Sequence, residues 1–329
     1  MEPTSLVIGA SGHLGGNLVR ALAAKGQSVL AGIRNPAHRA RLDGLGCKIV
    51  IADLLDRASL ARAMQGVSVL YQVGAVFKHW AREPEREIYQ ANMQGTRNAL
   101  EAATVAGVKR VVYVSSLAAL DRTRTPITAT TWNPSRANVY FRSKTDSEQL
   151  AWELAREHGF EMVSVLPSAM IGGHCFSLTP TMALFKTILD RKLPADPGFY
   201  FNFVNAADVA QGCWLAATKG RPGERYLLAN EAPTDVGEIV KIAQEMFPER
   251  NIKTPARPPK FVLGVIVSLM EWVARARGVE PQLQRNFLTE FSVREVCDIG
   301  PARRELGFDP APPHDAIRAT LAGLVSARP

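Results

Sequence analysis

Hydrophobic positions in the first half of the chain alternate between short continuous runs and longer stretches with helical spacing. The short runs predict buried strands at SLVIGA, SVLAGI, CKIVIA, SVLYQVGA, RVVYVSS and EMVSVLP, all between residues 5 and 167. The longer stretches predict helices over 17–25, 37–45, 59–64, 85–106 and 139–157. Because such alternation is typical of βαβ units, we predict an α/β fold with about seven strands in a doubly wound parallel sheet.

Three glycines, Gly9, Gly12 and Gly15, follow the first predicted strand and lead into a helical stretch. Glycines let the backbone turn tightly and approach a pyrophosphate, and the N-terminus of a helix offers unpaired N–H groups to it. This order of elements predicts a dinucleotide site, and by itself it leaves NAD, NADP and a flavin dinucleotide open. The predicted contacts from the turn are Gly9, Ser11, Gly12, His13, Leu14 and Gly15.

The regular alternation ends after Pro167. Two adjacent glycines, prolines at 180, 194 and 197, and an aromatic cluster over 199–203 follow. Ligands of open α/β sheets bind at the carboxyl ends of the strands, so irregular C-terminal segments are suited to cover a substrate. We therefore expect a dinucleotide-binding Rossmann domain over 1–169. A smaller, irregular substrate-binding domain is expected over 170–329, with some of its segments returning to the Rossmann sheet.

The end of the second strand indicates the type of cofactor. An acidic side chain there would bind the ribose 2′-hydroxyl of NAD, whereas an arginine accommodates the 2′-phosphate of NADP. The strand ends in AGIRNP, with Arg34 and no neighbouring carboxylate. Since a guanidinium is permanently charged and can bind a phosphate with two hydrogen bonds, NADP is predicted in preference to NAD, with Arg39 as a second contact.

Tyr140 and Lys144 are four residues apart at the start of a helical stretch, so they share one face of the helix. Ser116 ends the preceding strand of the same predicted sheet. Reduction of a ketone needs a proton at the oxygen that the hydride makes anionic, and Tyr140 could donate it. The Lys144 ammonium would lower the pKa of the phenol, and Ser116 would hold the carbonyl oxygen.

Together with GASGHLG, Asp53-Leu54, Gly74-Ala75, QANMQGT and LPSAMIGG, these residues resemble the extended short-chain dehydrogenase/reductases of the NAD-dependent epimerase/dehydratase superfamily. The resemblance covers nearly the whole chain, because FNFVNAADVA, GRPGERYLLANE and ARRELGFDP are similar to later segments of that family. It is closest to the dihydroflavonol-reductase-like branch, which includes hopanoid-associated sugar-epimerase-like and hydroxysteroid-dehydrogenase-like proteins.

The resemblance implies that Ser116, Tyr140 and Lys144 form the catalytic triad, with Lys144 also bonding the nicotinamide ribose. It implies a structural role for Asn92. The further cofactor contacts that it implies are Asp53, Leu54, Val73, Gly74, Ala75, Pro167 and Ser168. The chain departs from the family where the usual Thr-Gly opening reads Ile8-Gly9, and where TATTWNP lacks the acidic residue often found before the catalytic tyrosine.

Sugar-nucleotide dehydratases of this family carry an Asp-Glu pair directly after the catalytic hydroxyl, where Leu117 and Ala118 stand here. Dehydration is therefore not expected. A sugar-nucleotide epimerase remains an alternative, although epimerases usually keep NAD bound and Arg34 disfavours NAD. A non-catalytic NADPH-sensing regulator is an alternative of another class, although a regulator could dispense with Tyr140 and Lys144. We expect an oxidoreductase that transfers a hydride from NADPH to a ketone.

Candidate substrate contacts are aromatic or apolar. They follow the fourth strand at Phe77, His79 and Trp80, and the sixth at Met170, His174 and Phe176. Walls of this kind suit an apolar or aromatic small-molecule ketone better than a polyhydroxylated sugar. His79 and His174 could act as acid or base groups, but loop histidines are more often ordinary surface or packing residues.

The composition of the chain limits the kinds of binding partner and metal site that we expect. The chain has 329 residues, a formal net charge of +8 and a pI near 9.5, but its basic residues form no dense run, so nucleic acid is not expected as a partner. Four dispersed cysteines, Cys47, Cys175, Cys213 and Cys297, show no zinc or disulfide spacing, and no metal is expected. The N-terminus shows no secretory signal, which predicts a cytoplasmic enzyme.

Residues 261–273, FVLGVIVSLMEWV, are almost entirely apolar. They are fewer than the ~18–20 residues that a spanning helix needs, and they include Glu271, so no integral membrane span is expected. The segment is expected to pack on the protein, with a lid over an apolar pocket or a peripheral membrane contact as alternatives. By analogy with relatives, the helices beginning near Glu85 and Val139 could form the four-helix interface of a homodimer.

Overall fold

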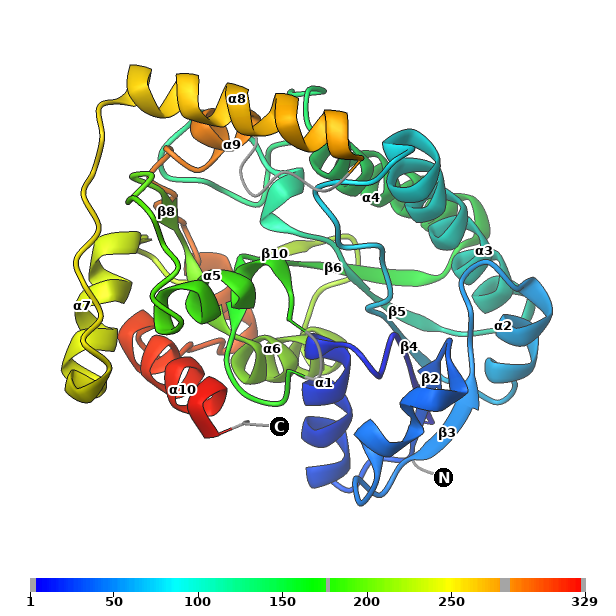
Figure 1. The fold of residues 1–329 in the computed structure, drawn as a ribbon. Helices are drawn as coiled ribbons and strands as arrows, with labels where there is room; N and C mark the ends of the chain where they lie inside the picture. The colour runs from blue at the N-terminus through cyan, green and yellow to red at the C-terminus, as the bar shows by residue number, and fades with distance from the viewer. Residues whose placement is uncertain (1–3, 176–177, 279–284, 327–329) are drawn as a thin grey trace.

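The computed structural model describes residues 4–175, 178–278 and 285–326, and its centre is a parallel sheet of seven strands (Figure 1). The strand order is β10-β6-β5-β4-β1-β2-β3, which confirms the predicted doubly wound sheet. The strands are β1 (Ser5–Ile8), β2 (Val29–Ile33), β3 (Lys48–Ile51), β4 (Val69–Gln72), β5 (Arg110–Val114), β6 (Glu161–Pro167) and β10 (Arg225–Leu228). The chain reverses its direction across the sheet between β1 and β4, where such folds bind ligands.

Helices cover both faces of the sheet, because its strands are apolar on both sides. On β1, Val7 packs with the helices of one face, and Leu6 and Ile8 pack with those of the other. The first face carries α1 (His13–Ala24) and α6 (Ala206–Thr218). The second carries α2 (Arg57–Ala63), α3 (Ala91–Val105) and α4 (Val139–His158) (Figure 1).

The observed helices differ from the predicted ranges mainly at their starts. α1 begins at His13 instead of residue 17, because the chain enters the helix directly from the glycine turn at Gly12. The helix predicted over 85–106 is divided into the π-helical turn η2 (Glu85–Gln90) and α3. The stretch predicted over 37–45 is the 3-10 helix η1 (Pro36–Leu42).

α4 has clear signals at both ends. The Asn138 side chain accepts hydrogen bonds from the backbone N–H groups of Tyr140 and Phe141, which would otherwise be unpaired in the first turn. Gly159 ends the helix in the left-handed conformation, at φ 71°. This capping fixes where the helix begins, and so it fixes the direction in which the side chain of Tyr140 leaves its first turn.

Residues beyond 168 form a second apolar core around Phe185, Phe203 and Ile239. The elements of this region are β7 (Ala169–Ile171), α5 (Pro180–Leu189), β8 (Tyr200–Phe201), β9 (Phe203–Asn205), β11 (Thr234–Asp235), α7 (Val236–Met246), α8 (Lys260–Arg277), α9 (Arg285–Glu290) and α10 (Pro313–Ser326). Strand β10 leaves this region to pair with β6 at the edge of the main sheet. The boundary predicted near residue 170 remains a prediction.

Candidate active site

The glycine turn lies at the carboxyl end of β1, against the end of β4. Gly9 has a φ of 86°, and a Cβ there would lie 2.8 Å from the Cα of Gly74. A Cβ on Gly15 would lie 2.1 Å from the carbonyl oxygen of Gly9, so α1 can approach the turn this closely only with glycine. Gly12 is the N-cap residue of α1, and no side chain caps this end of the helix. A tight turn leading to an uncapped helix N-terminus fits a dinucleotide pyrophosphate.

The predicted 2′-phosphate contact, Arg34, is exposed just after β2, and Arg39 is exposed on η1. Sequence reasoning missed a third arginine: the guanidinium of Arg41 donates a hydrogen bond to the carbonyl oxygen of Ser11 in the glycine turn, at 3.3 Å. Its position on the helix that follows the second strand could have identified Arg41 as a residue near the cofactor turn. The three arginines make this edge of the cofactor turn strongly cationic.

The other predicted cofactor residues also lie at the carboxyl edge of the sheet. Leu54 packs between two glycines, since a Cβ on Gly74 or Gly95 would lie 3.2 or 3.1 Å from its side chain. Asp53 precedes it, Val73 and Ala75 flank Gly74 after β4, and Pro167 and Ser168 close β6. Asn92 binds the loop after β4 by accepting from the N–H of Val76 at 2.7 Å, which is the structural role that the resemblance implies.

The three predicted catalytic side chains meet where β5 and α4 come together. The hydroxyl groups of Ser116, just after β5, and Tyr140, in the first turn of α4, share a hydrogen bond. One turn further along α4, the ammonium of Lys144 donates to the carbonyl oxygen of Val114 at 3.0 Å. All three residues lie near the carboxyl ends of the strands, where the glycine turn also lies.

Burial sets the protonation of this group. It raises the pKa of the Tyr140 phenol above its ordinary value, and the hydrogen bond with Ser116 opposes this shift only partly. It lowers the pKa of Lys144 to about 8, against the attraction of the Glu148 carboxylate. The net pKa of Tyr140 is therefore raised and not brought nearer to neutral pH as expected, because burial dominates it. The phenol stays protonated near neutral pH, which is the form that a proton donor requires.

An aromatic cluster packs against one side of Tyr140. The rings of Phe77 and His79 lie 5.2 Å from its ring, centroid to centroid. His79 also contacts Phe287 at 5.4 Å and Phe291 at 6.3 Å, from α9 and the residue after it. Sequence reasoning missed these two phenylalanines, although their spacing of four places them on one helical face. Burial lowers the pKa of His79 to about 4, so it is a neutral wall residue near pH 7.

The remaining candidate substrate contacts do not join this cluster. Met170 lies in β7 and packs against the core of the main sheet, and Trp80 is half-buried after β4. His174 is exposed and lies close enough to His13 and Arg20 to interact electrostatically with both, on the side of the glycine turn. Phe176 lies outside the described residues.

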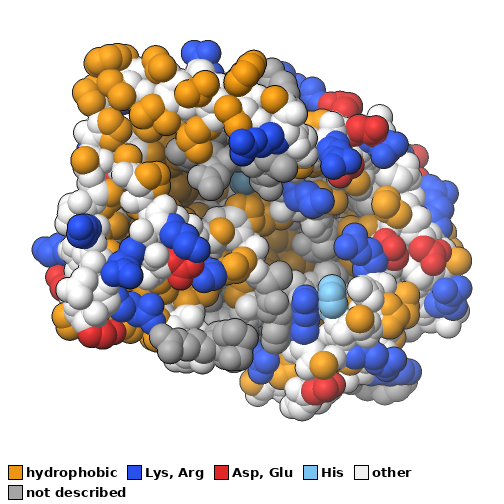
Figure 2. Space-filling view, in the orientation of Figure 1, with side chains coloured by type: hydrophobic (Ala, Val, Ile, Leu, Met, Phe, Trp, Pro, Cys, Tyr) orange, Lys and Arg blue, Asp and Glu red, His pale blue; other side chains and the backbone are white. Residues whose placement is uncertain are grey.

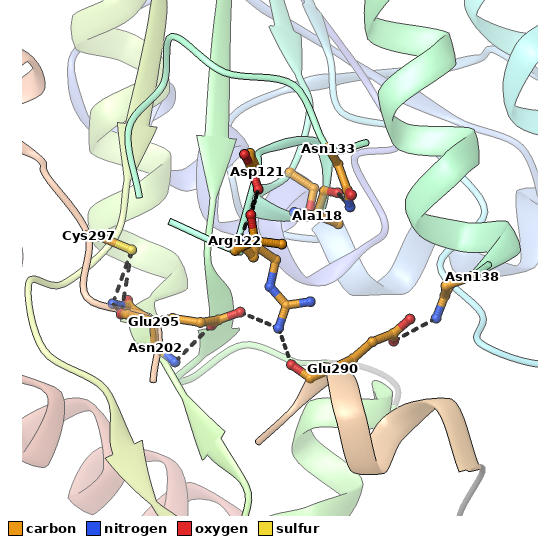
Figure 3. A network of polar contacts seen from close by, with 11 residues as sticks. Ala118, Asp121, Arg122, Asn133, Asn138, Asn202, Glu290, Glu295 and Cys297 are labelled. Carbon is orange, nitrogen blue, oxygen red and sulfur yellow. Dashed lines mark hydrogen bonds and ion pairs between the residues drawn. The ribbon is translucent and has the colours of Figure 1, made fainter. Parts of the chain in front are cut away.

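A buried polar network connects α9 with α4 (Figure 3). Arg122 forms an ion pair with Glu295 at 2.6 Å, and both side chains are 8% exposed. Its guanidinium also donates to the carbonyl oxygen of Glu290 at 2.5 Å. The Glu290 carboxylate accepts from the Asn138 side chain at 2.9 Å, and burial raises its pKa. Because Asn138 caps α4, the segment that carries Phe291 is fixed to the helix that carries Tyr140.

In the described part of the chain, no group of three or more His, Cys, Asp or Glu side chains is placed to hold a metal ion. The groups that this arrangement brings together are a phenol, an ammonium and a hydroxyl beside the glycine turn.

Comparison with known proteins gives matches over this whole arrangement. The model of the "NAD dependent epimerase/dehydratase family" matches residues 5–229. "Sterol demethylase protein B" of Methylococcus capsulatus is 34% identical over 98% of the chain and 97% of its own length. A Synechocystis protein named "Putative dihydroflavonol 4-reductase" is 35% identical over 70% and 69%. The crystal structure of yeast methylglyoxal/isovaleraldehyde reductase Gre2 with NADPH shares the fold, with a TM-score of 0.79, 18% identity and 98% coverage of both chains.

Proposed function

From the premise that this chain belongs to the NAD dependent epimerase/dehydratase family, the extended short-chain dehydrogenase/reductases, we propose that it reduces the carbonyl of an apolar or aromatic ketone with NADPH. The chain is an NAD(P)-dependent oxidoreductase of the reductase kind. The observation that carries the proposal for its substrate is the aromatic wall beside the catalytic phenol. Phe77 and His79 contact Tyr140, and Phe287 and Phe291 extend the wall by contacting His79.

This wall favours a ketone with apolar or aromatic surroundings for physical reasons. Aromatic rings gain stability by burying apolar area, but they offer few partners to the hydroxyl groups of a sugar, which would lose their hydrogen bonds to water. His79, being neutral, adds no charge to the wall. The names of two relatives refer to sterols and dihydroflavonols, which are apolar or aromatic ring systems.

The geometry supports the following roles for the chain's own residues. NADPH held by the glycine turn would supply the hydride for the carbonyl carbon. Tyr140 transfers its phenolic proton to the carbonyl oxygen, so that the ketone becomes an alcohol and Tyr140 becomes a phenolate. Ser116, which shares a hydrogen bond with Tyr140, can donate to the same oxygen and orient it. The Lys144 ammonium stabilises the phenolate, and solvent returns the proton.

The direct test of this function is a reductase assay. The purified enzyme is mixed with NADPH and a panel of apolar and aromatic ketones, and the loss of nicotinamide absorbance is followed. Turnover of at least one ketone at a rate proportional to enzyme concentration is expected. Sugar-nucleotide epimerisation without net NADPH consumption would instead support the epimerase alternative. NADPH binding without turnover of any substrate would support a regulator.

The proposed preference for NADP depends on Arg34 and Arg41, which lie at the end of β2 and against the glycine turn. Replacing either arginine by alanine is expected to raise the Kd for NADPH about tenfold to a hundredfold, since a hydrogen bond to a charged group contributes ~1.5–3 kcal/mol. The Kd for NADH should change much less. Arg318→Ala is the control, because Arg318 pairs with Glu245 on α10 and α7. Equal weakening of NADPH and NADH would contradict the assignment.

Lys144 predicts how the reaction depends on pH. The group is charged below its pKa of about 8, and the phenolate that forms at Tyr140 needs that charge. The kcat/KM for reduction is therefore expected to be constant between about pH 6 and 7, and to fall as pH rises through about 8. Lys144→Arg keeps its charge at high pH, so this variant should be slower but lack the decline near pH 8. A wild-type profile that is flat to about pH 10 would rule out this role for the ammonium.

A further inference from the structure

α8 exposes a broad apolar face. Phe261, Val265, Leu269 and Trp272 follow one another at helical spacing and are 61–76% exposed. Ile266, beside them, is 45% exposed. The opposite side of the helix is buried at Leu263, Val267 and Ala274. Figure 2 shows the result as a continuous band of hydrophobic side chains along the edge of the molecule where Figure 1 places α8.

A contiguous apolar face of this kind marks an interaction surface, because folding alone would favour polar residues on that side of a helix. A hydrogen bond attaches α8 to α9. The carboxylate of Glu271, the one acidic residue of α8, accepts a hydrogen bond from the backbone N–H of Arg285 at the start of α9, at 2.8 Å. The acidic group is thus used to attach α8 to its own protein.

The charges around this face indicate its partner. Lys260 and Arg277, at the two ends of α8, and Arg285, at the start of α9, are all exposed, and the whole chain has a formal net charge of +8. An apolar helical face with cations at its ends is complementary to a bilayer that contains anionic lipids. A second copy of the chain would bring the same positive charges together. Among the described residues, no helix has the length and apolarity needed to cross a bilayer, so the contact would be peripheral.

The face also lies close to the catalytic cluster. α8 packs on α9, and Phe287 of α9 contacts His79, whose ring lies 5.2 Å from that of Tyr140. The apolar surface and the aromatic wall are therefore separated by one short helix. On the proposed function, this arrangement would give a ketone dissolved in the bilayer a short path to the catalytic phenol.

We propose that α8 docks the enzyme peripherally on a bilayer containing anionic lipids, with Phe261, Val265, Leu269 and Trp272 inserted among the lipids and the basic residues at the headgroups. The docking itself depends only on this surface. It can therefore be tested without a cofactor or a ketone, and its failure would leave the proposed reductase activity unaffected.

The test is co-sedimentation of the full chain with vesicles of phosphatidylcholine mixed with phosphatidylglycerol. The double variant Val265→Glu/Leu269→Glu is compared with the matched control Leu55→Glu/Val105→Glu, which places the same two charges at positions that are 59% and 87% exposed on other surfaces. The wild type and the control should bind. The α8 variant should have a partition coefficient at least about tenfold lower, with an unchanged circular dichroism spectrum and thermal midpoint.

Two further measurements make the outcome decisive. Tryptophan emission should shift to the blue on vesicle addition in the wild type, and this shift should be absent in Trp272→Phe. Binding to vesicles of phosphatidylcholine alone should be much weaker. Equal vesicle binding by the wild type and the α8 variant would overturn the proposal, as would no binding by the wild type. If sedimentation velocity instead shows a dimer that the α8 variant dissociates, the face belongs to a second copy and the proposal fails.

Discussion

Replacing Tyr140 by phenylalanine is expected to lower kcat for ketone reduction by about a hundredfold to ten-thousandfold, the usual contribution of a positioned proton donor. The hydroxyl is the only group removed, and the ring that packs against Phe77 and His79 stays in place. The helix cap at Asn138 uses backbone N–H groups, so it is unaffected. Stability and the Kd for NADPH should therefore remain close to the wild-type values.

The measurement is single-turnover oxidation of NADPH with a ketone that the wild type reduces, beside a fluorescence titration with NADPH alone. Phe141→Leu is a suitable comparison, because Phe141 lies next in the helix, is similarly buried and carries no acidic proton. It should change kcat far less than the Tyr140 variant. Reduction by Tyr140→Phe at the wild-type rate would show that the proton comes from another group, and Ser116 would then be the first to test.

Local spacing is what made the candidate catalytic group visible in the sequence. Tyr140 and Lys144 share a helical face because they are four residues apart, and Ser116 is at the end of a strand whose apolar run is visible in the sequence. The glycine turn is similarly local. In each case the chemistry requires a residue type at a fixed offset from a regular element, so a short stretch of sequence carries the information.

The aromatic wall that we propose for the substrate was only partly predictable, for the opposite reason. Phe77 and His79 follow a recognisable strand, but Phe287 and Phe291 reach them from a helix that is more than half the chain away. Nothing local indicates that α9 contacts His79 beside Tyr140. That placement depends on the buried ion pair of Arg122 with Glu295 and on the hydrogen bond of Asn138 to Glu290, which join distant segments.

His174 shows the same limit. Its position after the sixth strand suggested a substrate contact, but the turn at Gly172 and Gly173 directs the chain towards α1. There His13 and Asn17 both contact the carbonyl oxygen of Gly173, at 3.2 and 3.3 Å. Such contacts decide the path of a loop after a strand. A glycine can adopt backbone angles that other residues avoid, as Gly172 does at φ 116°, so the sequence does not show which path the loop takes.

A second buried network, centred on Glu148, holds α4 in place. Glu148 is fully buried on α4, one turn after Lys144, and its carboxylate binds the guanidinium of Arg225 through two hydrogen bonds of 2.8 and 3.0 Å. It also accepts from the Ser115 hydroxyl at 2.5 Å. Arg225 lies on β10 and stacks over Trp132, 3.8 Å from the ring centroid. The pair therefore joins the helix that carries Tyr140 to the strand that returns from the C-terminal region.

Glu148→Gln is expected to lower the free energy of unfolding by about 3–5 kcal/mol, because it leaves the Arg225 charge buried without a counter-charge. Chemical denaturation followed by circular dichroism measures the loss. The control is Glu231→Gln, which breaks a pair with Arg303 at 2.7 Å whose side chains are 61% and 42% exposed; it should cost less than about 1 kcal/mol.

A third variant identifies the cause of the loss. Adding Arg225→Met to Glu148→Gln removes the unpaired charge, so the double variant should be more stable than Glu148→Gln alone. The same change has an opposing cost, because the carbonyl oxygens of Ala129 and Thr131 lose the hydrogen bonds that Arg225 donates to them. If the double variant is less stable than the single one, those backbone contacts outweigh the buried charge. Arg225 would then stabilise the protein chiefly by fixing the segment from 129 to 132 against β10, and Glu148 would serve to orient it.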